Sequence, residues 1–323
     1  MQPIQNAFSL RPCHARRLAG ATLSALALAG LLAGCSREGA APASPPATPE
    51  TAAAAAPAPA AAASADATGE TPDPVIPVQQ DDERAQAWMR AVFRDAYDPA
   101  KSQALVELQV DGDRQHHLMS LATSHALPDG RVALVVNGMP ADEHGERQTG
   151  RGSAGVLNVY LLQPEGSGWT VAERRESLAS MGSDGEIGSV EWVMLGSDKP
   201  GFTVSSYYTG QGQSITMVDI VELGHGVRHI GTLNLSSDNS GACWAESDMC
   251  WDIEGKLRFA EPASPDGHAD LVVDFNGKRY RVSEDANGES TEIPVATIRQ
   301  SARYAFDGKA YKVASGANPV DGD

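Results

Sequence analysis

Short alternating segments, separated by turn residues, are the feature that most limits the fold of this chain. Beyond residue 100, runs of about 4 to 8 residues rich in Val, Leu, Ile and Tyr are divided by Gly, Asn, Asp and Pro. Fifteen such candidate strands lie between Ala104 and Val313, at a spacing of roughly 8 to 15 residues. This pattern predicts an all-β fold of short antiparallel hairpins, arranged as a sandwich, a barrel or a propeller.

One amphipathic helix is expected before the strands. Asp81 and Asp82 are candidate N-terminal caps, and Asp98-Pro99 ends the pattern. The apolar stripe at helical spacing consists of Ala85, Trp88, Met89, Val92, Phe93 and Ala96. We expect this stripe to lie on the β core of a domain that occupies residues 81–323.

Two hairpin-like motifs recur along the chain. The segment from Phe275 to Val282, which contains Asn-Gly, is repeated from Phe306 to Val313 with Asp-Gly. Each predicts a tight hairpin with a turn of the primed type. Pro128-Asp-Gly is likewise echoed at Pro265-Asp-Gly. Such repeats favour a propeller-like ring of small sheets, and the chance recurrence of hairpin chemistry is the alternative.

The first 34 residues have the three parts of an export signal. Arg11, Arg16 and Arg17 precede an uncharged run from Leu18 to Ala33, and small residues follow it. At about 16 residues, the run is short for a stable transmembrane helix. We therefore expect residues 1–34 to be a signal peptide that is removed.

The end of this signal, Leu32-Ala33-Gly34-Cys35, resembles the lipobox of bacterial lipoproteins. The resemblance implies cleavage before Cys35, a diacylglyceryl cysteine with palmitate-type acyl chains, and a membrane anchor. Ser36 in place of Asp implies sorting to the outer membrane, with the domain in the periplasm. The alternative is an ordinary secretory signal with an incidental cysteine.

Residues 35–80 are expected to be the lipidated cysteine and a disordered tether. They are Ala and Pro with scattered Ser, Thr, Glu and Asp, and almost no large apolar residues. Such a segment cannot bury enough surface to offset its ordering entropy. Recurrent prolines oppose a continuous helix.

The chain is acidic, with 42 Asp and Glu against 25 Lys and Arg and a net charge of −17. Loss of the three signal arginines would make the mature chain more negative. This balance disfavours nucleic acid and anionic lipid as ligands, because both require a positive face. A cationic protein partner would be steered towards the chain, and plain solubility is the alternative reading of the charge.

Cys243 and Cys250 would be the two cysteines left besides Cys35 once the signal is removed. In an oxidising compartment, two thiols seven positions apart are expected to form a disulfide that closes a small loop. A metal site would need further Cys or His ligands, which the neighbouring sequence lacks. We expect no metal and no cofactor.

The segment Asp266-Gly-His-Ala-Asp270-Leu-Val-Val273 resembles the Asp-Gly-x-x-Asp-Leu core of FG-GAP propeller blades. With the lipobox, tether and closing hairpin, the layout is similar to periplasmic propeller-like lipoproteins, some of which act as lysozyme-inhibitor-like immunity proteins. Calcium in such a loop needs oxygen ligands ahead of the Asp-Gly. Pro262 and Ser264 stand there, so we expect a structural turn.

No motif for nucleophilic, metal-dependent or phosphate-binding catalysis occurs in the chain, and we predict no catalytic residues. The adjacent His116 and His117 should point to opposite faces of a strand. We interpret these histidines, like His225 and His229, as surface or turn residues. A pair of carboxylates for glycoside hydrolysis could still be hidden among the many acidic residues.

The segment Tyr207-Tyr-Thr-Gly-Gln-Gly-Gln213 is the best candidate for a binding loop. Aromatic and amide side chains on a Gly-rich turn are typical of protein or sugar contacts. We select Tyr207, Tyr208 and Gln211 as partner-binding residues, complemented by an acidic protrusion with Asp184 and Glu186. The alternative is a plain hairpin whose tyrosines pack on the sheet.

These features together predict a membrane-anchored periplasmic binding protein rather than an enzyme. The expected activity is inhibition of, or immunity against, a cell-wall hydrolase. Two alternatives remain open: a carbohydrate- or peptidoglycan-active hydrolase, and a scaffold lipoprotein of envelope assembly.

Overall fold

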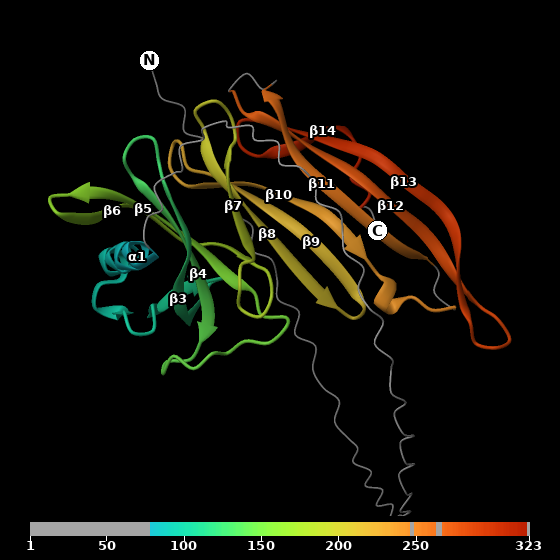
Figure 1. Cartoon of the computed structure of the whole chain (residues 1–323), viewed down its shortest axis with the longest axis horizontal. Helices are drawn as coiled ribbons and strands as arrows, with labels where there is room; N and C mark the ends of the chain where they lie inside the picture. Colours follow the sequence, from blue (N-terminus) through green and yellow to red (C-terminus); the bar gives the residue numbers. More distant parts are fainter. Residues whose placement is uncertain (1–77, 246–248, 263–266, 322–323) are drawn as a thin grey trace, which may run out of the picture. The chain divides into compact units, whose positions relative to one another are not determined.

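The computed structural model describes residues 78–245, 249–262 and 267–321 (Figure 1). The export signal, Cys35, the tether and Asp266 therefore lie outside the described residues. Within them, one α-helix precedes fourteen strands in two antiparallel sheets. No helix among these residues has the length and apolar character needed to cross a membrane.

The first sheet contains six strands in sequence order. They are β1 (Tyr97–Asp98), β2 (Gln103–Val110), β3 (Asp113–Ala126), β4 (Val132–Ala141), β5 (Gly155–Glu165) and β6 (Gly168–Met181). The helix α1 (Val78–Phe93) and the 3-10 turn η1 (Arg94–Ala96) come before β1.

The second sheet contains eight strands, again in sequence order. They are β7 (Ser189–Met194), β8 (Pro200–Gly210), β9 (Gln213–Glu222), β10 (Arg228–Asp238), β11 (Cys250–Pro262), β12 (Ala269–Glu284), β13 (Ser290–Phe306) and β14 (Tyr311–Gly316). A second 3-10 turn, η2 (Ser240–Ala242), lies between β10 and β11.

The middle of the first sheet is covered on both faces. Successive side chains of a strand point to opposite faces, so Leu134 and Val136 of β4 join the core beneath α1. Ala133 and Val135 join a second core, which also contains Phe202 of β8 and residues of β9. The first sheet is therefore a central layer between α1 and the second sheet, as the arrangement in Figure 1 shows.

The helix α1 lies on the first sheet through the predicted apolar stripe, which is confirmed from Ala85 to Phe93; Ala96 lies beyond the helix, in η1, and is exposed. Trp88, Met89, Val92 and Phe93 are buried, and each such burial stabilises the fold by about 2 kcal/mol. The helix begins at Val78, earlier than expected. The prediction of Asp81 and Asp82 as caps is therefore wrong, because both lie inside the helix.

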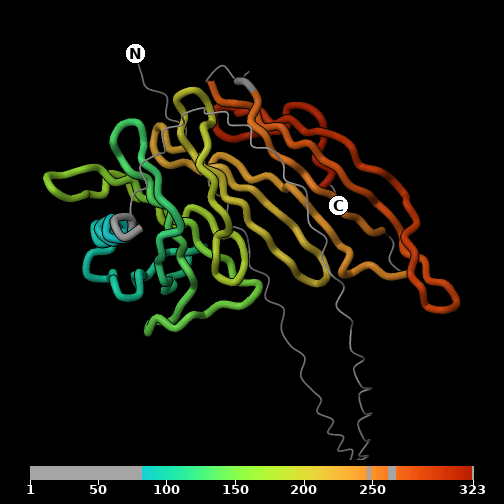
Figure 2. Tube along the Cα trace, in the orientation of Figure 1, coloured from blue at the N-terminus to red at the C-terminus, as the bar shows by residue number. Residues whose placement is uncertain are grey.

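The second sheet curls around a core of its own. Residues from early strands, such as Val218 and Ile230, share this core with Phe275 and Tyr311 from late strands. The curl brings the start of β12 beside the end of β7, where the Ala269 amide donates a hydrogen bond to the Leu195 carbonyl at 2.6 Å. Figure 2 shows the long β12–β13 hairpin, in orange and red, extending beyond the neighbouring strands.

The hairpin predicted at Asn276-Gly277 is wrong. Strand β12 continues through both residues, paired with β11 on one side and β13 on the other. A Cβ at Gly277 would collide with the Asp252 carbonyl oxygen, so this glycine permits a close approach of two strands instead of a turn. The matching hairpin at Asp307-Gly308 is confirmed, and it joins β13 to β14.

The all-β class, the antiparallel hairpins and the single preceding helix are confirmed. The propeller-like description holds loosely, because the strands form two large sheets in place of a ring of small blades. Sequential strands are hydrogen-bonded neighbours throughout each sheet, so the hairpin pattern of the sequence maps directly onto the topology.

Candidate functional site

The predicted binding loop is the tip of the β8–β9 hairpin. Gly210 pairs with Gln213, which leaves Gln211 and Gly212 as the two turn residues. Both adopt positive φ, 53° and 76°, as a type I′ turn requires. The hairpin is thus tight, and its terminal residues have a fixed conformation.

Tyr207 and Tyr208 remain 55% and 41% exposed near this tip. Because they are adjacent on a strand, they face opposite sides of the sheet. Tyr207 shares its face with Ser214, to whose Oγ its hydroxyl donates at 2.9 Å. The hydrogen bonds with Ser214 and Thr209 lower the pKa of Tyr207. The two tyrosines therefore do not form one flat patch.

Tyr208 lies on the concave face of the curled sheet, where it lines a pocket of about 280 Å³. The floor of this pocket is a row of cross-strand neighbours on four consecutive strands: Tyr208, Ile215, Ser237 and Ile253. Gln213 and Ser214 lie at the hairpin end of the pocket, and Val320 of the C-terminal segment also lines it. The pocket is therefore an extension of the core of the second sheet that stays open at the hairpin tip.

Trp251 forms one wall of this pocket. Its indole Nε1 donates to the Ser237 Oγ at 2.9 Å, which fixes the ring against the floor. The Ser237 hydroxyl and the Gln213 amide supply polar groups beside the two aromatic rings. A small number of placed polar groups in an aromatic pocket suits an amphipathic side chain or a sugar ring.

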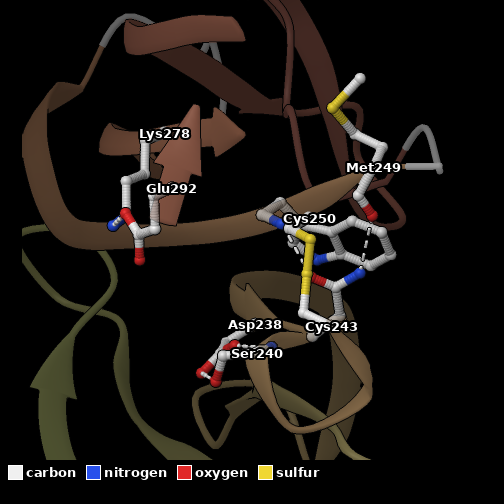
Figure 3. The surroundings of a disulfide bond; sticks show 9 residues. Asp238, Ser240, Cys243, Met249, Cys250, Lys278 and Glu292 are labelled. Atoms are coloured by element: carbon white, nitrogen blue, oxygen red, sulfur yellow. Dashed lines mark hydrogen bonds and ion pairs between the residues drawn. A yellow bond between two sulfur atoms is a disulfide. The ribbon is translucent and has the colours of Figure 1, made fainter. Parts of the chain in front are cut away.

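A disulfide follows the segment that contacts the hairpin tip, and Figure 3 shows its surroundings. Cys243 and Cys250 form the predicted disulfide, with Cα atoms 5.9 Å apart. On either side of Cys250, the Asn239 side chain donates to the Met249 carbonyl at 3.0 Å and accepts from the Trp251 amide at 2.7 Å. Gly212 packs against the backbone of Gly241 in η2, directly before Cys243. The tip therefore contacts the segment that leads into the disulfide.

The acidic protrusion lies in the connection between the two sheets. Asp184 is exposed, with a φ of 55°, whereas the Glu186 carboxylate accepts a hydrogen bond at 2.9 Å from Asn137 of β4. Gly188, which follows, lies against the backbone of Ser205 on β8. The protrusion therefore enters the second sheet close to the strand that carries the two tyrosines, and Glu186 is held by the first sheet.

Several other polar residues are explained by packing. Asp270 of the FG-GAP-like motif is fully buried and ion-paired with Arg303. Glu222 is also buried, where it accepts from Arg228 Nε at 3.0 Å and lies 3.2 Å from His268 Nε2. Such pairing is what buried carboxylates require.

The histidines differ in their surroundings. His117 is buried, against the expectation of a surface residue, and its burial lowers its pKa. It faces the core because β3 places alternate residues there, whereas His116 is only half-buried. His229 lies beside Asp219, with 2.7 Å between Nε2 and Oδ1.

Paired carboxylates for hydrolysis were sought in the described pockets. Asp129 and Asp198 both line a small hollow of about 190 Å³. Asp129 is ion-paired with Arg131 at 2.7 Å, and this contact lowers its pKa. Among the described residues, no group of three His, Cys, Asp or Glu side chains is arranged to hold a metal.

No protein-family model, curated protein or solved structure matches the chain. Its function is therefore inferred from its own residues and geometry.

Sequence reasoning missed the residues that complete the pocket. Trp251 follows Cys250 directly, so its place beside the disulfide was visible, but its contact with Ser237 was not. Val320 carries no sequence signal, because it reaches the pocket only through the C-terminal segment, where Asn318 donates to the Asn234 carbonyl at 2.9 Å.

Proposed function

We propose that this chain is a lipid-anchored periplasmic binding protein that inhibits a cell-wall hydrolase through the tip of its β8–β9 hairpin. One observation carries the proposal: two adjacent tyrosines stay 55% and 41% exposed beside a turn that packs on η2, next to the Cys243–Cys250 disulfide. Exposed aromatic side chains are the commonest energetic anchors of protein interfaces.

Rigidity of the tip supports a binding role. A loop that is already ordered loses little conformational entropy when a partner binds, so more of the contact energy is retained as affinity. The type I′ turn, the packing of Gly212 on Gly241 and the Asn239 hydrogen bonds all contribute to this order. Tyr208 and the pocket beside it would receive a side chain of the partner, while Tyr207 would contact it from the other face.

The charge of the chain supports a hydrolase as the partner. An enzyme that binds anionic peptidoglycan presents a positive surface to it, and a chain of net charge −17 would be attracted to that surface. Acylation of Cys35 would keep the inhibitor at the outer membrane. The Ala- and Pro-rich tether would let the domain reach into the periplasm from there.

The proposal is tested with the full-length protein purified from membranes in neutral detergent. Lysozyme-type muramidases and the cell's own envelope hydrolases are mixed with suspended peptidoglycan, and turbidity is followed with and without the protein. We expect the protein to slow clearing by at least one of these enzymes at a stoichiometric ratio. If every enzyme clears peptidoglycan at its full rate and gel filtration detects no complex with the protein, the proposal is wrong.

A further inference from the structure

A second site lies on the other sheet, at the C-terminal end of α1. Arg90, Arg94 and Arg174 line a groove of about 570 Å³, together with Trp169 and Thr170 of β6. The remaining lining residues are apolar, and none is acidic. Three arginines around one groove contrast with the net charge of −17 of the whole chain.

Arg174 is fixed in the groove by three contacts. Its Nη2 donates to the Val92 carbonyl at 2.9 Å, its Nη1 donates to the Glu176 carboxylate at 2.6 Å, and its guanidinium lies 5.1 Å from the centre of the Tyr160 ring. The bond to Val92 also satisfies a carbonyl at the end of α1, where unpaired carbonyls would repel an anion. Arg174 thus supplies a positive charge whose position is set by the fold.

Arg90 and Arg94 are the adaptable members of the groove. Both are exposed, and within the described part of the chain neither is ion-paired with a carboxylate; Arg90 donates only to the Gln86 side chain, at 3.2 Å. Arg94 adopts a φ of 51° directly after α1, a conformation that is costly for a residue with a Cβ. Their guanidinium groups remain available to a ligand.

We propose that this groove is a binding site for a phosphate group. Three arginines and the Glu176 carboxylate leave a local charge of about +2. This balances the negative charge of about −2 on a phosphate monoester. A phosphate offers three acceptor oxygens, one more than a carboxylate, so it can accept from several guanidinium groups at once. Trp169 gives the carrier of the phosphate a flat surface.

The phosphate could be carried by a soluble molecule or by a lipid headgroup. A long polyanion does not fit, because the net charge of −17 of the chain would repel the part of it outside the groove. The site is independent of the β8–β9 tip, so inhibition of a hydrolase and phosphate binding can be tested separately.

The test uses the full-length protein in neutral detergent and isothermal titration at low salt. One arm titrates inorganic phosphate, and the other titrates micelles doped with phosphatidic acid, a lipid phosphomonoester, against micelles doped with phosphatidylcholine. R90A/R94A should weaken binding by about tenfold or more. R90K/R94K, which keeps the charge but loses the planar fork, should bind with intermediate affinity.

Arg281 provides the matched control, because it is an exposed arginine on β12, far along the chain from the groove. R281A should bind the probes as the unaltered protein does. Binding of free phosphate identifies a soluble ligand, and binding of phosphatidic acid micelles alone identifies a headgroup. Failure of the unaltered protein to bind either probe would overturn the proposal. So would equal affinity of R90A/R94A, or equal weakening by R281A.

Discussion

Gly212 in the β8–β9 turn lies directly against Gly241 of η2, two residues before Cys243, so closely that a Cβ at position 212 would collide with the backbone of residues 241 and 242. Two segments 29 positions apart in the chain thus make a close backbone contact through their glycines. This contact links the candidate binding tip to the segment that leads into the disulfide. Its contribution to the free energy of unfolding can be measured.

Replacement of Gly212 by alanine should destabilise the tip for two reasons. The φ of 76° is unfavourable for alanine, and the added methyl group has no space. We expect a loss of about 2 to 3 kcal/mol in the free energy of unfolding, measured by urea denaturation. Gly130→Ala is the control, because Gly130 also has positive φ but open space around its Cβ position; it should cost about 1 kcal/mol. Equal losses would show that the contact with Gly241 is unimportant.

Removal of the disulfide should lower stability and weaken partner binding together. C243S/C250S opens a loop of seven-residue separation, for which the unfolded chain gains entropy worth about 2 kcal/mol. Thermal unfolding of the oxidised protein and the double variant measures this difference. If stability falls while affinity for the hydrolase stays constant, the disulfide does not contribute to the conformation of the binding tip.

Burial of His117 predicts a loss of stability in mild acid. Because burial lowers the pKa of His117 in the folded state, the unfolded chain binds a proton at this residue first as the pH falls below about 6.5. Stability is therefore fully present above that pH and declines between it and the lower folded pKa. H117Q should flatten the decline in urea midpoint from pH 7 to pH 5. An identical decline in H117Q would assign the acid sensitivity to other groups.

The hydroxyl of Ser214 should set the ionisation of Tyr207. Once Tyr207 ionises, the Ser214 and Thr209 hydroxyls can donate to the phenolate, and this lowers the pKa of Tyr207. S214A should therefore raise the pKa of Tyr207 towards its ordinary value. Ultraviolet titration of S214A, with Y207F used to identify the signal, measures the shift. No shift would mean that the hydrogen bond is absent in solution.

The class of the fold could be predicted from the sequence, because alternation and turn residues act locally. Local chemistry alone could not separate the two Gly-Lys motifs, however. Gly308 follows Asp307 in a real turn, whereas Gly277 follows Asn276 inside a continuous strand. The difference arises from strands β11 and β13, which pair with both edges of β12 and hold it extended. Such pairing is a tertiary effect, and no local motif reports it.

The candidate site was only partly predictable for a similar reason. The turn at Gln211 and the exposed tyrosines follow from local composition, and the period of two in a strand already implies that Tyr207 and Tyr208 face opposite sides. The pocket beside Tyr208 depends on the curl of the second sheet and on Val320 from the C-terminal segment. These contacts join distant parts of the chain, so the sequence carries no direct sign of them.

The most direct test of the proposed function is the peptidoglycan-clearing assay with two variants of the full-length protein in neutral detergent. It compares inhibition by Y207S/Y208S with inhibition by V313S. Val313 is as exposed as the tyrosines but lies on β14, away from the tip. We predict that Y207S/Y208S raises the half-inhibitory concentration about tenfold or more, since two aromatic anchors are lost, and that V313S leaves it unchanged. Unaltered inhibition by Y207S/Y208S would contradict the account.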